Sequence, residues 1–136
     1  MKHTFVRPAR PADAHEAVEW MLKTANNEFD PEVVKFPTTV TWCAYTQDGP
    51  VAYLPVQQPF MADALGSRPG ADYNEVAAAL KELMHNLVSQ AHIKGVGEIY
   101  FLTKDEATAR FAENHHFEEI PYRLFRVKMA DLERRG

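Results

Sequence analysis

The segment of residues 74–92 constrains the fold most, because it is a long amphipathic helix enclosed between two strand-like runs. Its apolar residues recur at helical spacing, and Gly95 supplies a stop signal after it. Residues 60–65 before the helix and residues 98–102 after it have the length and composition of strands. Strands and helices therefore intermingle along the chain, which favours a layered α/β (α+β) fold over a helical bundle or a β-sandwich.

The rest of the chain continues this alternation. Strands are predicted at residues 4–6, 39–45 and 51–54, the last two joined as a hairpin through the turn at 47–49. Asp13, Asp30 and Asp105 are predicted N-caps of three further helices. Residues 117–120 and 122–127 read as closing strands. We expect a mixed, mostly antiparallel central sheet flanked by about four helices, in one domain over residues 1–130 with a short tail at 131–136.

Composition excludes several classes of protein. The 136 residues carry 15 Lys+Arg and 19 Asp+Glu, a formal charge of -4, so nothing favours binding to nucleic acid or anionic membranes. No run approaches the roughly 20 apolar residues that span a bilayer, and the first residues lack the apolar core of a signal peptide. The single cysteine, Cys43, rules out an intrachain disulfide. A cytoplasmic protein is expected.

The order of elements, opened by Phe5-Val6-Arg7-Pro8-Ala9 with Asp13 and closed by His116-Phe117-Glu118-Glu119-Ile120, resembles the GNAT superfamily of acetyl-CoA-dependent N-acetyltransferases. The resemblance runs over nearly the whole chain. In that family the strand before the long central helix splays from its neighbour and the pantetheine arm enters the gap. The pyrophosphate sits on the helix N-terminus, where free N–H groups and the helix dipole attract anions.

The cofactor loop departs from the family pattern. The family pattern is Gln/Arg-x-x-Gly-x-Gly/Ala. In this chain Asp72 stands at the Gln/Arg position, Glu75 at the first glycine and Ala77 at the second small position, so the loop is degenerate. Two carboxylates there oppose a diphosphate and make acetyl-CoA binding doubtful. Arg68 with the amides near Gly70 and Ala71 forms an alternative anion cradle, and Asn74 is either a ligand contact or the N-cap of the helix. The cofactor-binding residues implied by the resemblance are Leu65, Ser67, Arg68, Gly70, Ala71, Tyr73, Asn74 and Ala77.

The usual catalytic side chains of the family are replaced. Ala112 stands where many members carry a tyrosine acid, and Met61 stands at the commonest place of the base. Asp63 lies two residues after Met61, on the same strand face, and is the nearest substitute as general base. His85 and His92 share a helix face but lie seven apart, and no ligand set completes a metal site, so no metal is expected.

Two functions from different classes remain open. One is an N-acyltransferase that moves an acetyl group from acetyl-CoA to a small-molecule amine or a protein. The other is a catalytically inactive module of the same fold that binds another small molecule or a protein partner. The acceptor is unknown, and the oligomeric state is open, with a homodimer as one alternative.

Overall fold

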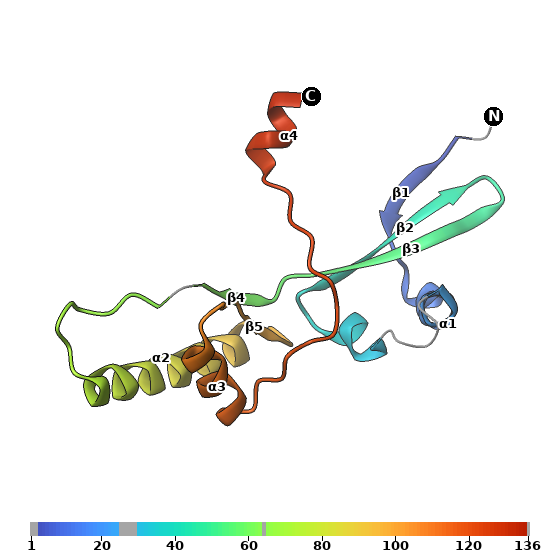
Figure 1. Ribbon diagram of the computed structural model, residues 1–136. Coiled ribbons are helices and arrows are strands. Elements are labelled where there is room, and N and C mark those ends of the chain that lie inside the picture. Colours follow the sequence, from blue (N-terminus) through green and yellow to red (C-terminus); the bar gives the residue numbers. More distant parts are fainter. Residues whose placement is uncertain (1–2, 25–29, 64, 136) are drawn as a thin grey trace. The chain divides into compact units, whose positions relative to one another are not determined.

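The computed structural model describes residues 3–24, 30–63 and 65–135 (Figure 1). The chain forms two compact units, residues 1–102 and residues 103–136. All strands and the two longest helices belong to the first unit. The predicted α+β class with mostly antiparallel strand pairing is confirmed. The expected single domain over residues 1–130 stays a prediction.

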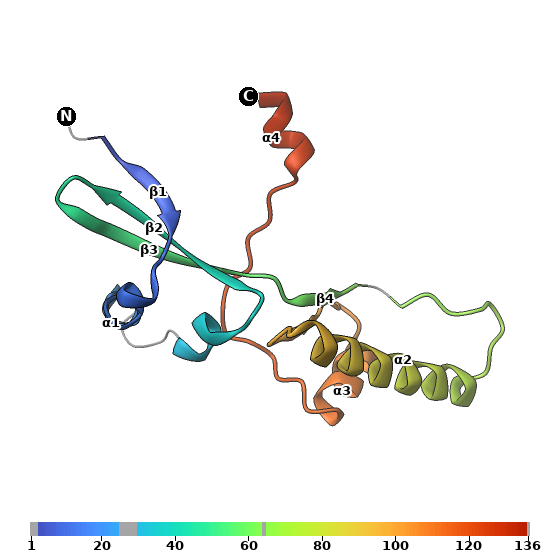
Figure 2. The same cartoon turned by 180° about the vertical axis from the view of Figure 1, so that it is seen from behind.

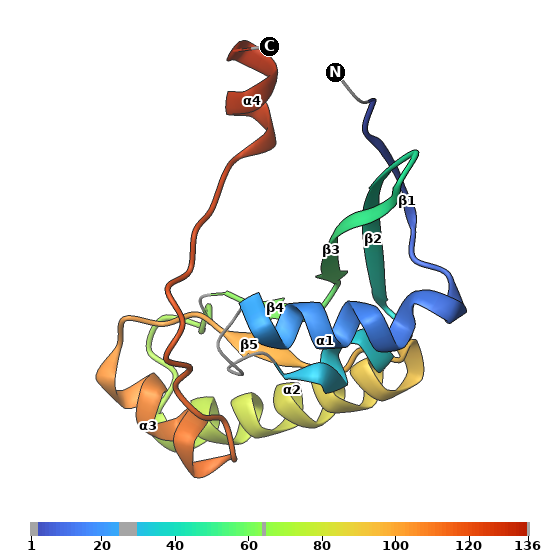
Figure 3. The same cartoon turned by 90° about the vertical axis from the view of Figure 1, so that its right-hand side faces the viewer.

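Three strands form an antiparallel sheet in the order β1 (Phe5–Pro8), β2 (Thr39–Thr46) and β3 (Gly49–Gln57) (Figure 2). The predicted hairpin between β2 and β3 is confirmed, with Gly49 at a φ of 113° that suits glycine. Helix α1 (Ala14–Thr24) packs beside this sheet (Figure 3). The ring of Trp20 on α1 lies 5.3 Å from that of Tyr53 on β3, and Cys43 on β2 is fully buried. Helix α1 therefore covers the sheet face that carries Cys43 and Tyr53.

Asp13 anchors the connection between β1 and α1, but not as the predicted N-cap. A short 3-10 helix, Pro11–Asp13, precedes α1, and Asp13 is its last residue. One oxygen of its carboxylate accepts hydrogen bonds from the Arg10 backbone N–H at 2.8 Å and from the Arg7 guanidinium at 3.0 Å. These bonds lower the pKa of Asp13, because they favour its charged form. The cap at Asp30 is confirmed, although the helix it begins, Pro31–Lys35, is again 3-10.

The second sheet is a parallel pair, β4 (Phe60–Ala62) and β5 (Ile99–Phe101), connected through helix α2 (Tyr73–Lys94). The helix is longer than the predicted 74–92 by one residue at its start and two at its end. Gly95 ends it as predicted, at a φ of 71°, and its N–H bonds back to the carbonyls of the last turn. The strands thus fall into two sheets, where we expected one central sheet.

The second unit contains helices α3 (Glu106–Asn114) and α4 (Met129–Arg135). The prediction of strands at 117–120 and 122–127 is wrong: among residues 103–135 the structure has no strand. An alternating sequence gives a segment the propensity for a strand, but a strand also needs a neighbouring edge for its backbone hydrogen bonds. Residues 131–135, for which we expected a short tail, belong to α4.

Candidate functional site

The N-terminus of α2 is closed by a carboxylate of the chain itself. One oxygen of Asp72 accepts the backbone N–H of Asn74 at 2.7 Å and that of Glu75 at 3.1 Å. Asp72 has an extended backbone (φ -76°, ψ 161°), as an N-cap requires. The interpretation of Asn74 as the N-cap is therefore wrong, because Asn74 already lies in the first turn. The two amides that would face an incoming anion are bonded to Asp72.

Arg68, the cation of the expected anion cradle, pairs with Glu75. Its guanidinium lies 2.8 Å from the Glu75 carboxylate, and the two side chains are 71% and 56% exposed. The backbone N–H of Ala71 donates to the Arg68 carbonyl at 3.1 Å, which closes a turn containing Gly70 at a φ of 82°. The loop thus gathers Arg68, Ala71 and Glu75 at the start of α2. An exposed ion pair contributes little free energy, about 0–1 kcal/mol, so Arg68 can exchange its partner cheaply.

The other expected cofactor residues lie along the same loop and the first turns of α2. Leu65 and Ser67 are exposed in the loop, Tyr73 is 84% exposed at the first helical position, and Ala77 is half-buried one turn later. No hydrogen bond among the described residues joins Leu65, Ser67 or Tyr73 to the Arg68–Glu75 pair. Whether these residues bind a cofactor stays a prediction.

Asp63 directly follows the paired part of β4. Strand pairing runs from Phe60 opposite Ile99 to Ala62 opposite Phe101, and the Leu102 N–H donates to the Ala62 carbonyl at 3.0 Å. The side chain of Asp63 is exposed at this point. The candidate base thus lies at the carboxyl end of a parallel strand pair, which is the end where α/β folds hold their ligands.

A polar cluster at the opposite, amino end of β5 was missed by the sequence analysis. One oxygen of the Glu98 carboxylate accepts from the Gln57 amide at 2.9 Å and from the Tyr100 hydroxyl at 3.1 Å. All three residues are half-buried. Tyr100 lies opposite Met61 in the register, so it shares a sheet face with Met61. The alternate spacing of Glu98 and Tyr100 in the sequence is the signal that could have placed both side chains on one face of the strand.

In the second unit, Ala112 is buried at 8% exposure on α3. The imidazole of His115 stacks on the ring of Phe111 at 4.1 Å, and its Nδ1 lies 2.8 Å from the Phe111 carbonyl. His115 therefore interacts with a terminal carbonyl of α3, in agreement with the preference of histidine for helix C-termini. These contacts give His115 a structural role at the end of the helix.

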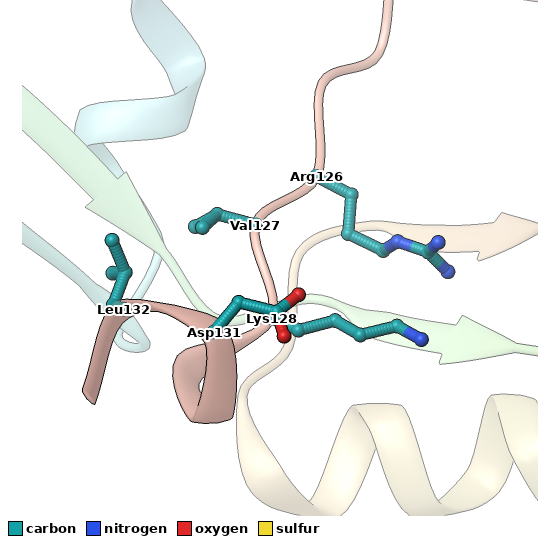
Figure 4. A pocket seen from close by; sticks show the side chains of 5 residues that line it. All are labelled: Arg126, Val127, Lys128, Asp131 and Leu132. Atoms are coloured by element: carbon teal, nitrogen blue, oxygen red, sulfur yellow. The ribbon is translucent and has the colours of Figure 1, made fainter. Parts of the chain in front are cut away.

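Two hollows lie outside the loop that precedes α2. One, of about 310 Å³, is at the start of α4, where Arg126 and Lys128 extend to the same side beside Asp131 (Figure 4). The other, of about 350 Å³, lies among β1, α1, the 3-10 helix Pro31–Lys35 and β2, and its lining is largely apolar. Neither is lined by a residue of the expected cofactor loop.

The described residues contain no grouping of three or more His, Cys, Asp or Glu side chains that could hold a metal ion. None of the helices among them combines the length and apolar character needed to cross a lipid bilayer.

Comparisons with known proteins give only distant similarities. No protein-family model matches the sequence, and no curated protein matches it. The chain is similar to the structure of a predicted acetyltransferase with acetyl-CoA from Clostridium acetobutylicum, at 12% identity and a TM-score of 0.37, over 95% of this chain and 98% of the other. It is also similar to a ribosomal-protein-alanine N-acetyltransferase from Brucella melitensis biovar Abortus 2308, at 10% identity and a TM-score of 0.35, over 93% and 99% of the two chains. These values are too low to assign the chain to a family.

Proposed function

We propose that this chain is a GNAT-like N-acyltransferase that uses acetyl-CoA to acylate an amine. The observation that supports this function best is the β4–α2–β5 arrangement. The described pairing of the two parallel strands reaches the bond from the Leu102 N–H to the Ala62 carbonyl, and the chain that leaves β4 leads to the N-terminus of α2. The carboxyl end of parallel strands beside a helix N-terminus is a common binding place for nucleotide-like ligands.

The loop fits the phosphates of such a ligand in part. Arg68 offers a guanidinium that binds phosphate in bidentate fashion, and its pair with Glu75 is exposed and readily exchanged. The α2 N-terminus does not fit as it stands, because Asp72 occupies two of its amides. The Ala71 N–H is also occupied, by the Arg68 carbonyl. In this proposal the coenzyme diphosphate therefore binds Arg68 and the backbone of residues 66–70 ahead of the helix.

Acetyl-CoA supplies an acyl group activated as a thioester. The chain contributes a proton acceptor in Asp63, whose exposed carboxylate takes a proton from the acceptor ammonium and leaves it a nucleophilic amine. When the N–C bond forms and the C–S bond breaks, the nitrogen gives up its second proton to water, and water protonates the departing thiolate, so that the products are an amide and a free thiol. The positioning of the reactants provides most of the rate, because the ordinary acid and base positions of the family hold Ala112 and Met61.

A second function, a binding module that has lost the coenzyme, is favoured by the Asp72 cap. A carboxylate on the α2 amides satisfies the anion preference of the helix without any ligand. In this alternative, the loop and strand ends bind another small molecule or a protein.

Thermal unfolding with acetyl-CoA separates the two functions. A site with a Kd of about 10 µM gains about 2.7 kcal/mol at about 1 mM ligand, which raises the Tm of a domain of this size by several degrees. Arg68→Gln should remove most of that shift, whereas Arg110→Gln, at an exposed arginine on α3, should retain it. Release of free thiol with a panel of amines then tests transfer. A cooperative melt without a shift would leave the binding module as the function, whereas a shift without transfer to any amine would contradict both functions.

A further inference from the structure

The charge of the segment from β4 to the second turn of α2 disagrees with that of the complete coenzyme. Residues 60–80 carry one cation and three carboxylates, a formal charge of -2: Arg68, Asp63, Asp72 and Glu75. Coenzyme A itself carries about four negative charges, of which the phosphate on its ribose contributes about 1.5–2. Like charges repel, so this segment disfavours a ligand with all of those phosphates.

Three backbone donors of the segment are already bonded within the chain. Asp72 accepts the N–H groups of Asn74 and Glu75 at 2.7 and 3.1 Å. The Arg68 carbonyl accepts the N–H of Ala71 at 3.1 Å. Helix N-termini bind diphosphates through several free amides together, and here two amides of the first turn are bonded to a carboxylate. The charged donor that the segment offers an anion is therefore the Arg68 guanidinium.

Arg68 is suited to a single phosphate group. Its Nη2 lies 2.8 Å from Oε2 of Glu75, so the guanidinium already binds one anionic oxygen, which a phosphate oxygen can replace. A guanidinium binds two oxygens of one phosphate through parallel N–H groups, and its one positive charge offsets one negative charge of the ligand. For a further phosphate, residues 60–80 hold no second cation. The segment thus matches one phosphate and not three.

We propose that this site recognises its acyl donor as an acyl phosphopantetheine, a thioester arm that ends in one phosphate, and that the nucleotide part of the coenzyme adds no affinity. The inference rests on the proposed function, because it concerns the donor of the same site. Arg68 binds the phosphate attached to the pantetheine arm and releases Glu75. The charges of Asp72 and Glu75 then oppose every further phosphate. Acetyl-CoA contains the phosphopantetheine unit and remains a donor.

Isothermal titration with a series of truncated donors tests this specificity. Acetyl-dephospho-CoA and S-acetyl phosphopantetheine should bind at least as tightly as acetyl-CoA, because they carry fewer phosphates. S-acetylpantetheine, which has no phosphate, should bind at least about tenfold more weakly than S-acetyl phosphopantetheine, since it loses the charged contact with Arg68. Arg68→Gln should remove that difference. Lys35→Gln is the matched control and should retain it, because Lys35 also belongs to an ion pair, 3.1 Å from Glu32.

Each comparison is a ratio of two Kd values of one protein, so a variant that is partly unfolded does not imitate the expected result. If acetyl-CoA bound at least about tenfold more tightly than both truncated phosphate donors, the inference would be wrong and the proposed function would stand. Equal binding of S-acetylpantetheine and S-acetyl phosphopantetheine would also overturn it, as would an unchanged difference in Arg68→Gln. If none of the thioesters bound, the proposed function itself would be refuted, and the inference with it.

Discussion

Asp72→Ser isolates the charge that occupies the α2 N-terminus. Serine is as good an N-cap as aspartate, so the substitution retains a hydrogen bond to the first-turn amides and changes helix stability by only a few tenths of a kcal/mol. It removes the negative charge that lies 2.7 Å from the Asn74 nitrogen and 3.1 Å from the Glu75 nitrogen. If the proposed function is right, affinity for acetyl-CoA should rise.

The magnitude follows from Coulomb's law. For a phosphate about 6 Å from the Asp72 carboxylate, two unit charges repel by about 3 kcal/mol at an effective dielectric of about 20. Because Asp72 is exposed, salt screens part of this repulsion. A remaining gain of about 1–2 kcal/mol corresponds to roughly a tenfold tighter Kd.

Isothermal titration of acetyl-CoA into the two proteins measures this gain directly. Asp105→Ser is the control, because Asp105 caps another helix, α3: its carboxylate accepts the Thr108 N–H at 2.9 Å and the Thr108 hydroxyl at 2.7 Å. This variant should leave the Kd of acetyl-CoA unchanged. If the Kd of the Asp72→Ser protein stayed within twofold of the wild-type value, the electrostatic argument would be refuted. A titration at high salt should also shrink the difference between the two proteins.

Three further predictions concern stability. The backbone N–H of Arg10 and the Arg7 side chain lower the pKa of Asp13, so its charged form stabilises the fold above the ordinary pKa of 3.8. Urea unfolding should therefore show that Asp13→Asn destabilises the protein at pH 7. This destabilisation should disappear as the pH falls below 3.8. Burial, with a hydrogen bond to a carboxylate, raises the pKa of Tyr53, so wild-type stability should fall relative to Tyr53→Phe as pH rises above 10.0. Gly95→Ala should cost about 1–2 kcal/mol, measured by thermal unfolding, since Gly95 has a φ of 71° and its added methyl would lie 3.1 Å from a proline ring. Gly66→Ala, where no atom lies within 4 Å, should cost nothing.

The local elements of the fold could be predicted where the signal lies within a few residues. Helix α2, its stop at Gly95 and the β2–β3 hairpin each depend on near neighbours in sequence, and each was predicted. The N-cap of α2 was misplaced by two residues, because Asp72 and Asn74 are equally good capping residues and only the backbone conformation decides between them. The prediction of Asp13 as an N-cap was wrong for a similar reason, since a 3-10 helix that begins with Pro11 precedes α1.

Pairing between distant segments was harder to predict. Residues 122–127 have the alternation of a strand, yet alternation states only which side chains share a face and not which edge the segment meets. The Glu98 cluster was missed because its donors, Gln57 and Tyr100, come from separate strands. Contacts of this kind depend on register, which the sequence does not contain explicitly.

The charge of the cofactor loop is the point where structure changes the argument most. The sequence places two carboxylates, Asp72 and Glu75, against a diphosphate, and predicts strong repulsion. In the structure, Arg68 lies 2.8 Å from Glu75 and offsets its charge, so the loop presents one net negative charge in place of two. That remaining charge is Asp72, and it already satisfies the helix amides. Replacing Glu75 alone should therefore release Arg68 and strengthen phosphate binding, whereas replacing Arg68 alone should restore the full repulsion. The two effects have opposite signs only if the diphosphate binds at this loop.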